Sequence, residues 1–253
     1  MTEGRCRKSS ECLILRILLL FLFLPSLADP IARWGVFEVK VRDQTVAKPD
    51  AKNEFGKIYD SLITACRGDS FARAEKWLFP VAGYSVKDMG KGGFQPHIRY
   101  GSSPVKGYDF FDGNRHGGHP AYDIFIRDTN HDCLDDRTGK PVAVVAPLDL
   151  LVLSVNTGWN PGSEIRGGNY IWALYPSGNL LLYFAHLDTI TVAPGRRCRA
   201  GDTLATIGRT GKSAAPKRSP THLHFMTLEV TGDSLKPKDW QREISKSVIF
   251  RRH

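Results

Sequence analysis

Short apolar runs separated by turn-forming residues make up most of the chain after residue 79. The runs are KPVAVVAPLDLLVLSV, NYIWALYPSGNLLLYFAHL, DTLATIGRTG and THLHFMTLEV, with glycine, proline, asparagine and aspartate between them. Pro176, Ser177 and Gly178 interrupt the second run and predict a hairpin at that point. Many short strands at close spacing predict an all-β domain, built as a compact antiparallel sheet between a sandwich and a barrel.

Residues 29–78 have a different hydrophobic pattern, which predicts a short helical or extended segment ahead of the β domain. In residues 29–47, mainly β-branched positions favour a short extended stretch: Val36, Phe37, Val39 and Val41. In residues 51–78, apolar positions recur at helical spacing: Ile58, Leu62, Ile63 and Cys66. A glycine break within that stretch predicts two short helices. Such a segment could pack on the main domain, cover its cleft or act as a removable pro-segment.

The first 28 residues have the three parts of a secretory signal peptide. A basic start is followed by LILRILLLFLFLPSLA and by the small-residue ending Ser26-Leu27-Ala28, which predicts cleavage after Ala28. A permanent membrane anchor is the alternative. The unbroken apolar run, residues 17–24, is too short to span a bilayer. We therefore expect export to the periplasm or the cell exterior, without stable membrane insertion.

The chain is basic, with a formal net charge of +9. Removal of residues 1–28 would leave 31 basic and 24 acidic residues, a net charge of +7. A basic exported protein would be attracted to polyanions such as cell-envelope polymers. No nucleic-acid-binding motif accompanies the scattered charge, so we expect no nucleic-acid partner. A basic surface that serves only solubility is an equally good interpretation.

Three cysteines remain after the predicted cleavage: Cys66, Cys133 and Cys198. Export would allow a disulfide, and three thiols permit one bridge with one thiol left over. Cys133 and Cys198 both lie in loop-like stretches of the β domain, so we predict that they pair. None of the cysteine spacings resembles that of a zinc site.

The motif THLHF places two imidazoles on one face of a strand. Residues i and i+2 of a strand point to the same side, so His222 and His224 would stand together while Leu223 and Phe225 face the other way. Neutral imidazole is the commonest metal ligand among side chains. A single histidine on such a face is more often packed or exposed without function, so the motif needs partners elsewhere in the domain.

Three further polar residues are candidates for those partners. His119 and Asp123 lie in NRHGGHPAYDIF, where Pro120 and two glycines favour a loop that runs into a strand beginning near Asp123. His186 ends the apolar run LLYFAHLD. A catalytic zinc takes three protein ligands and leaves a position for water, whose pKa falls from 15.7 towards about 7. Additional histidines could move a proton or stabilise the developing oxyanion.

The order of these motifs resembles the lysostaphin-like, or LytM-type, zinc endopeptidases, which cut peptidoglycan cross-links. The resemblance covers residues 79–230, about 150 residues. Its pieces are FPVAGY, HPAYD, KPVAVVAPLDLLV, YFAHLD, VAPGRRCRAGDTLATIGRTG and THLHF. The set is specific, whereas HxH or HxxxD alone would be a weak signal. The resemblance implies an all-β peptidase domain with an open substrate groove.

The resemblance also implies roles for the five polar residues. His119, Asp123 and His224 would hold one Zn²⁺ ion per chain. His186 and His222 would be the catalytic pair that activates the water and stabilises the tetrahedral intermediate. The implied protein is a secreted zinc metalloendopeptidase, expected to be a monomer, whose partner is a peptidoglycan peptide substrate.

Two alternatives stay open at this point. Some relatives that have lost metal ligands regulate other wall hydrolases, but all five polar positions are present here, which favours an enzyme. A zinc peptidase that acts on proteins rather than the wall would have the same site residues. We expect four parts: a signal peptide (1–28), an N-terminal attachment (29–78), the peptidase domain (79–232) and a basic tail (233–253).

The chain departs from the family pattern in three places. Leu150 stands where the family's strand usually has glycine, and SAAPKRSP before Thr221 gives the cleft rim a basic loop suited to an anionic substrate or a different cross-link. The third departure is RDTNHDCLDDRTGK, an acidic loop with calcium-like alternation of oxygen ligands: Asp128, Asn130, Asp132, Asp135 and Asp136.

The calcium interpretation of this acidic loop is weak. Cys133 replaces the glycine that a calcium loop of the EF-hand type requires, and no glutamate stands at the twelfth position. A solvated acidic turn is therefore the favoured interpretation, with Ca²⁺ at Asp128, Asn130 and Asp132 as the alternative. His116 and His131 match no family position, and we expect them on the surface or the rim of the cleft.

Overall fold

The computed structural model describes residues 29–73, 76–89 and 107–250 of the 253-residue chain. The signal-peptide prediction for residues 1–28 lies outside the described residues. Within the described part, no helix combines the length and the apolar composition that a membrane crossing requires. The helices are α2 (Pro30–Arg42), α3 (Lys48–Ala65) and α4 (Gln241–Ser245), with short 3-10 turns η2 (Val86–Met89), η4 (Phe110–Arg115) and η5 (Pro176–Gly178).

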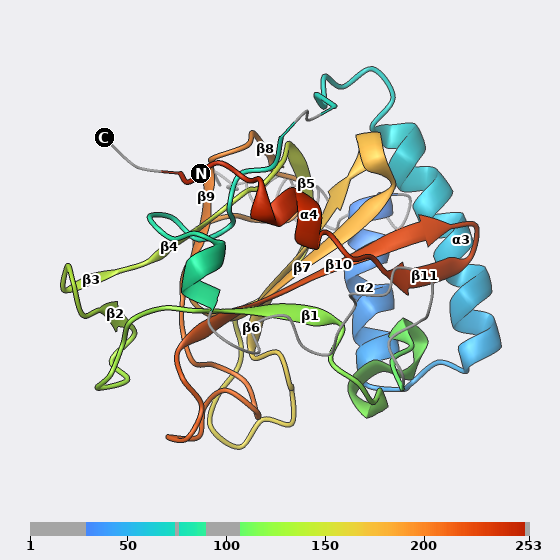
Figure 1. The fold of residues 1–253 in the computed structure, drawn as a ribbon. Helices are drawn as coiled ribbons and strands as arrows, with labels where there is room; N and C mark the ends of the chain where they lie inside the picture. Colours follow the sequence, from blue (N-terminus) through green and yellow to red (C-terminus); the bar gives the residue numbers. More distant parts are fainter. Residues whose placement is uncertain (1–28, 74–75, 90–106, 251–253) are drawn as a thin grey trace, which may run out of the picture.

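The rest of the described chain is dominated by strands. They are β1 (Ala121–Phe125), β2 (Leu134–Asp135), β3 (Lys140–Pro141), β4 (Ala143–Val145), β5 (Leu150–Asn156), β6 (Asn169–Tyr175), β7 (Leu180–Ile190), β8 (Arg197–Cys198), β9 (Thr203–Ile207), β10 (His222–Thr231) and β11 (Ser234–Pro237). Nine of them form one antiparallel sheet in the order β1-β10-β7-β6-β5-β8, extended by β11 on β10 and by β9 and β4 beyond β7 (Figure 1). The predicted fold class, a β domain preceded by short helices, is confirmed.

The predicted hairpin is also present. η5 joins β6 to β7, and Asn179 adopts the left-handed conformation, with φ of 52°, that lets the chain reverse. β7 is unusually long because it pairs with β10 and β6 along its first part and with β9 along its end. One long strand therefore ties the main sheet to the β4–β9 layer.

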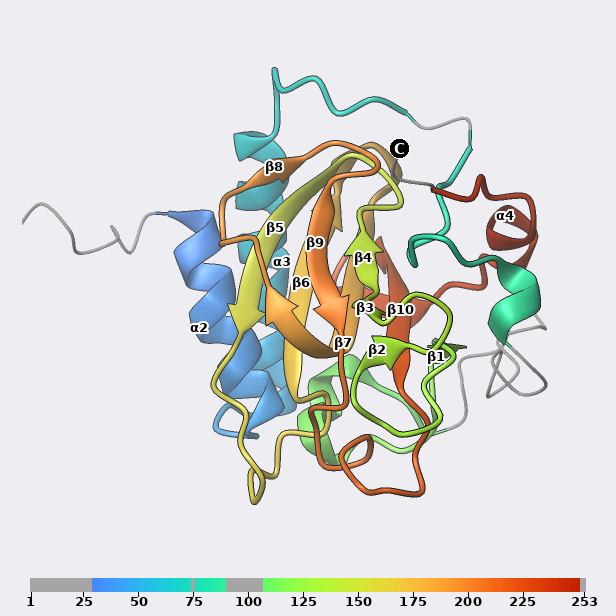
Figure 2. The same cartoon turned by 90° about the vertical axis from the view of Figure 1, so that its left-hand side faces the viewer.

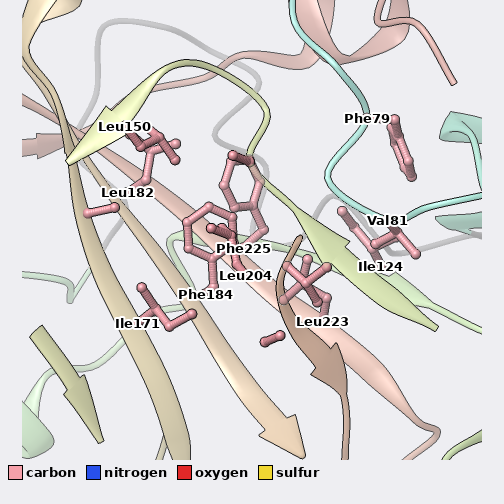
Figure 3. Packing of buried hydrophobic residues seen from close by; sticks show 14 of the residues in the cluster. Phe79, Val81, Ile124, Leu150, Ile171, Leu182, Phe184, Leu204, Leu223 and Phe225 are labelled. Carbon is pink, nitrogen blue, oxygen red and sulfur yellow. The ribbon is translucent and has the colours of Figure 1, made fainter. Parts of the chain in front are cut away.

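One face of the sheet packs against that second layer and forms the larger core. Leu223 and Phe225 of β10 point into this core together with Phe184 of β7 and Leu204 of β9, and all four are fully buried. Figure 3 shows their side chains converging between the strands, and the rings of Phe184 and Phe225 lie 5.1 Å apart. The alternation along β10 therefore fixes which face its histidines occupy.

The opposite face of the sheet carries the N-terminal helices. α2 and α3 lie side by side there, on the side away from β4 and β9 (Figures 1 and 2). Trp34, Phe37 and Phe55 pack in an aromatic cluster with Phe110 of η4 and Trp172 of β6, with ring centroids 5.6–6.3 Å apart. The helices are thus part of the domain's own hydrophobic core.

The extended stretch predicted for residues 29–47 is wrong, because this segment is helix α2. Its buried positions follow a helical period rather than a strand period: Trp34, Phe37, Glu38 and Val41. Val36, which suggested a strand, is 56% exposed. Pro30 opens the helix, and the Asp29 side chain accepts a hydrogen bond of 3.0 Å from the Ile31 N–H.

The two short helices predicted for residues 51–78 are also wrong, although a glycine does follow the helix that is found: Gly68, with φ of 92°, lies just beyond its last residue, Ala65. α3 is one helix of 18 residues, and Gly56 lies inside it. Its apolar face continues past the glycine, because the buried residues Ala51, Phe55, Ile58 and Leu62 form one stripe on the sheet-facing side. Tertiary packing of that stripe outweighs the helix-weakening effect of a single glycine.

The predicted Cys133–Cys198 disulfide is wrong as well, because Cys66, Cys133 and Cys198 are free thiols. Cys198 lies in β8 with its side chain in the apolar core. Cys133 belongs instead to the acidic loop, where burial and nearby carboxylates raise the pKa of its thiol to about 11. Both thiols are therefore in environments that favour the protonated, unreactive form.

The packing of α2 on the sheet gives a stability prediction. Trp34 is fully buried, and its indole N–H donates a 3.3 Å hydrogen bond to the Ser154 hydroxyl of β5. Trp34→Ala should lower the free energy of unfolding by about 3–5 kcal/mol, measured by chemical denaturation. Val36→Ala on the exposed face should change it by less than about 0.5 kcal/mol. Equal losses in the two variants would contradict the observed helix orientation.

Candidate metal centre and active site

Two neighbouring strands bring the central polar residues together. β1 pairs antiparallel with β10, and Asp123 lies directly opposite His224 in that register. Asp123 is the third residue of β1, which confirms the predicted loop running into a strand. Because Leu223 and Phe225 point into the core, His222 and His224 point to the other face, as the sequence predicted.

His119, Asp123 and His224 form a compact group of potential metal ligands. The Nε2 atom of His119 lies 3.0 Å from one carboxylate oxygen of Asp123, and the Nδ1 atom of His224 lies 3.1 Å from the other. One ligand atom from each residue falls within 4.8 Å of the other two. The imidazoles of His119 and His224 stand almost perpendicular, with centroids 4.9 Å apart. Two nitrogens and one oxygen at this spacing could bind a single metal ion.

His186 and His222 lie beside this group with their rings held by backbone carbonyls. Nδ1 of His186 is 2.8 Å from the carbonyl oxygen of Thr210, and Nδ1 of His222 is 2.7 Å from that of Pro220. A carbonyl oxygen only accepts, so Nδ1 carries the proton in both rings and Nε2 is the atom left for chemistry. The two ring centroids are 4.8 Å apart.

The electrostatics of the site favour neutral imidazoles around an ionised carboxylate. Burial, reinforced by the neighbouring His222 and His224, lowers the pKa of His186 well below its ordinary value. Burial also lowers the pKa of His224. Burial alone would raise the pKa of Asp123, but hydrogen bonds to His119 and His224 hold it well below the usual range. These are the protonation states in which imidazole and carboxylate bind metals.

His186 occupies a strained backbone position. Its φ is 63°, in the left-handed region, and the register of β7 shifts on both sides of it against β6 and β9. The sequence placed His186 at the end of a strand, whereas β7 continues to Ile190. The backbone is held by hydrogen bonds of 2.9 Å from the His186 N–H to the Gly167 carbonyl and from the Gly208 N–H to the His186 carbonyl. Such strain in a non-glycine residue is typical of functional sites.

Two glycine-containing loops hold the Thr210 carbonyl that orients His186. A Cβ atom at Gly168 would lie 2.3 Å from the carbonyl carbon of Thr210, and one at Gly211 would lie 2.4 Å from the carbonyl oxygen of Arg166. Both glycines also have positive φ. The loops therefore approach each other backbone to backbone, which requires residues without side chains.

The candidate site opens into a cavity of about 340 Å³. The five predicted site residues all line it, so the structure brings together every one of them. Sequence reasoning missed several other residues of its wall: Glu38, Arg42, Tyr108, Arg166, Tyr170, Trp172 and Tyr183. Tyr183 lies closest to the metal group, with its ring centroid 6.2 Å from that of His224. Period-2 spacing from His224 could have indicated Met226. The same spacing from His186 would have indicated Phe184, which lies in the core, because the register of β7 shifts at His186. Nothing in the sequence pointed to α2.

The two histidines that match no family position, His116 and His131, lie outside the group of five site residues. His116 lines the cavity, its Nδ1 lies 2.9 Å from the Gly117 carbonyl oxygen, and burial lowers its pKa. It therefore lies at the rim, as predicted. His131 is half-buried in the acidic loop and is not part of the cavity wall.

The acidic loop uses its carboxylates to hold its own backbone. Asp128 accepts hydrogen bonds from the N–H groups of Asp132 and Cys133 and from the Thr221 hydroxyl. Asp132 accepts from the Leu134 N–H and from the amide of Asn130. These oxygens already have protein donors. The structure therefore gives no support to the predicted calcium ion at Asp128, Asn130 and Asp132.

Comparison with known proteins agrees with the geometry of the site. Residues 129–237 match the model of Peptidase family M23. Over this range, which is less than half of the chain, the protein is similar to M23 peptidases. His186, His222 and His224 lie inside the matched range, and His119 and Asp123 precede it by a few residues. The resemblance to lysostaphin-like peptidases is confirmed, and this family consists of zinc peptidases.

A curated relative extends the comparison. Glycyl-glycine endopeptidase ALE-1 of Staphylococcus capitis is 30% identical over 113 residues, which are 44% of this chain and 28% of the relative. The match thus spans less than a third of that relative's length.

Solved structures of similar proteins share part of the fold. Lysostaphin from Staphylococcus simulans is 23% identical with a TM-score of 0.37, over 58% of this chain and 49% of its own. A zinc-containing peptidase from Vibrio cholerae is 19% identical with a TM-score of 0.32, over 54% of this chain and 35% of its own. At these values the structural likeness by itself decides nothing about activity.

The glycine loops give a prediction about the support of His186. Gly211→Ala would force a Cβ against the Arg166 backbone at positive φ, so it should cost at least about 2 kcal/mol of unfolding free energy. Gly158→Ala is the matched control, because no atom lies within 4 Å of its added Cβ. Thermal unfolding of both variants measures the difference, and an unchanged melting temperature for Gly211→Ala would contradict the close loop contact.

Proposed function

We propose that the protein is an exported zinc endopeptidase that hydrolyses peptide bonds in peptidoglycan. The observation that carries this proposal is the assembly of His119, Asp123 and His224 at one end of a cavity, with His186 and His222 beside them. The match to family M23 supports a peptidase. The similarity to a glycyl-glycine endopeptidase supports a cell-wall peptide as substrate, and the apolar stretch within residues 1–28 supports export.

The donor set fits zinc. Zinc accepts imidazole nitrogen and carboxylate oxygen and, in catalytic sites, leaves a position for water beside three protein ligands. His119, Asp123 and His224 would hold it. When bound, the ion would make a water molecule acidic enough to serve as a nucleophile near neutral pH.

The two remaining histidines supply proton transfer and oxyanion stabilisation. His186 is neutral with its Nε2 atom free to accept, so it is suited to take a proton from the attacking water and return it to the leaving amine. His222 holds its Nε2 atom 3.8 Å from Asp123. Because its Nδ1 proton is donated to the Pro220 carbonyl, Nε2 can donate a hydrogen bond to the developing oxyanion only when the ring carries a second proton, and in that charged form the ring would stabilise the negative charge. The carbonyl anchors on Nδ1 keep both rings oriented throughout.

A regulatory module without enzymatic activity is less well supported. Such a role does not require five polar residues to meet in one cavity, yet all five do. The buried, ring-oriented His186 and His222 would also have no function in a protein that only binds.

The direct test uses residues 29–253 incubated with purified peptidoglycan, with and without a metal chelator. Mass spectrometry of the released material should find fragments with new amino termini at the cross-links or in the stem peptides, and chelation should abolish them. Intact peptidoglycan from protein with confirmed zinc would contradict the proposed substrate. Cleavage that survives complete metal removal would contradict the metal chemistry.

The proposed division of labour among the histidines makes a second prediction. His224→Ala removes a ligand, so it should lose zinc and activity together. His222→Ala leaves the three ligands in place, so it should keep most of its zinc while turnover falls by about 10²–10⁴-fold. Metal content by atomic emission and turnover are measured on the same samples. Equal loss of zinc in both variants would show that His222 is itself a ligand.

A further inference from the structure

The cavity has a second polar group at the end formed by helix α2. Glu38 and Arg42 of α2 line the cavity together with Tyr170 of β6. Helix α2 lies outside residues 129–237, the range matched to family M23. The N-terminal segment therefore contributes Glu38 and Arg42 to a cavity whose other polar residue here, Tyr170, lies within the matched range.

The strand register relates this group to the metal centre. Asp123 of β1, His224 of β10, Ala185 of β7 and Tyr170 of β6 lie opposite one another in successive strand pairs. Residues in such a row share one face of the sheet. Tyr170 is two strand spacings from His224, which is about 10 Å at about 4.8 Å per spacing. Ala185 lies between them in this row and is fully buried, while Gly167 and Tyr183, which lie next to it, line the cavity.

Glu38, Tyr170 and Arg42 are joined by short hydrogen bonds. The Tyr170 hydroxyl lies 3.0 Å from both carboxylate oxygens of Glu38 and donates to them. The same hydroxyl accepts a 2.9 Å hydrogen bond from Nη1 of Arg42. The other side of the Arg42 guanidinium binds both oxygens of Asp43 at 2.7 Å. The charge of Arg42 is therefore already compensated by Asp43.

Glu38 is consequently a buried carboxyl group that Arg42 reaches through the Tyr170 hydroxyl and not as a direct ion pair. Its residue is only 5% exposed, and among the described residues no cation lies within ion-pair distance of it. Burial raises its pKa to about 7, although the hydrogen bond from Tyr170, the positive charge of Arg42 and a hydrogen bond from Ser154 oppose the shift. A buried acid in this state is destabilised when ionised, and a positive charge beside it removes that penalty.

Attachment of α2 to the sheet does not explain why position 38 carries a carboxyl group. α2 is already fixed to the sheet by Trp34 and Phe37, which are fully buried in the aromatic cluster. An apolar residue at position 38 would attach the helix as well, and replacing a buried ionisable group by an apolar one is often neutral or stabilising. The structure instead keeps a carboxyl group at the wall of the cavity.

We propose that Glu38 and Tyr170 form a subsite for a primary ammonium group of the substrate, about 10 Å from the bond that is cleaved. This inference rests on the proposed function and specifies its substrate. The separation equals about three residues of extended peptide at about 3.3 Å per residue, or a shorter path that ends in a long aminoalkyl side chain. The enzyme would thus prefer wall peptides whose free amine reaches this end of the cavity.

The experiment compares two forms of the same peptidoglycan, one with its amines free and one with its amines acetylated. Acetylation removes the positive charge and the preference that depends on it. The wild-type chain should release fragments at least about ten times faster from the free-amine form, since losing the partner of a buried charge weakens binding strongly. Glu38→Gln should cut both forms at the same low rate. Glu54→Gln is the matched control and should retain the wild-type preference, because Glu54 pairs with Lys40 and neither residue lines the cavity.

The outcomes separate the subsite from the function on which it rests. Equal wild-type rates on the two forms, or an unchanged preference in Glu38→Gln, would overturn the subsite while leaving the endopeptidase intact. No release from either form by zinc-loaded wild type would overturn the proposed function and the subsite with it. Tyr170→Phe, which keeps the ring and removes only the hydroxyl, should reduce the preference and covers the case in which Glu38→Gln fails to fold.

Discussion

The pairing of β1 with β10 is the contact on which the rest of the site depends. It places Asp123 opposite His224. This register is fixed because Leu223 and Phe225 are buried in the core on the other face of the sheet. A slip of one residue in this register would turn the histidines into the core and the aromatic residue out of it, at a large cost in buried apolar area. The hydrophobic core therefore sets the geometry of the polar site.

The second constraint is that the N-terminal helices cover the same face of the sheet. The cavity is lined by His224 and Tyr170, which lie in one row across the sheet, and by Glu38, Val41 and Arg42 of α2. Helix α2 therefore forms part of the wall of the same cavity as the metal group. Trp34 and Phe37 are fully buried, so they attach α2 to the sheet through the hydrophobic core.

The sequence was informative where one short motif determined both backbone and chemistry. The alternation around His222 and His224 predicted their common face, and Pro120 with its glycines predicted the loop before Asp123. α2 was misread because valines favour strands locally, whereas its helical period depends on a partner surface far along the chain. The contribution of Glu38 to the cavity could not be predicted, since it depends on where α2 packs.

The central claim is that His119, Asp123 and His224 bind one zinc ion. Crystals of zinc-loaded protein examined by anomalous diffraction at the zinc absorption edge would locate every zinc ion directly. The proposed division of roles predicts one strong zinc peak, bonded to His119, Asp123 and His224, with the Nε2 atoms of His186 and His222 facing the ion but not bonded to it. A peak at the acidic loop alone, or no peak in this cavity, would contradict it.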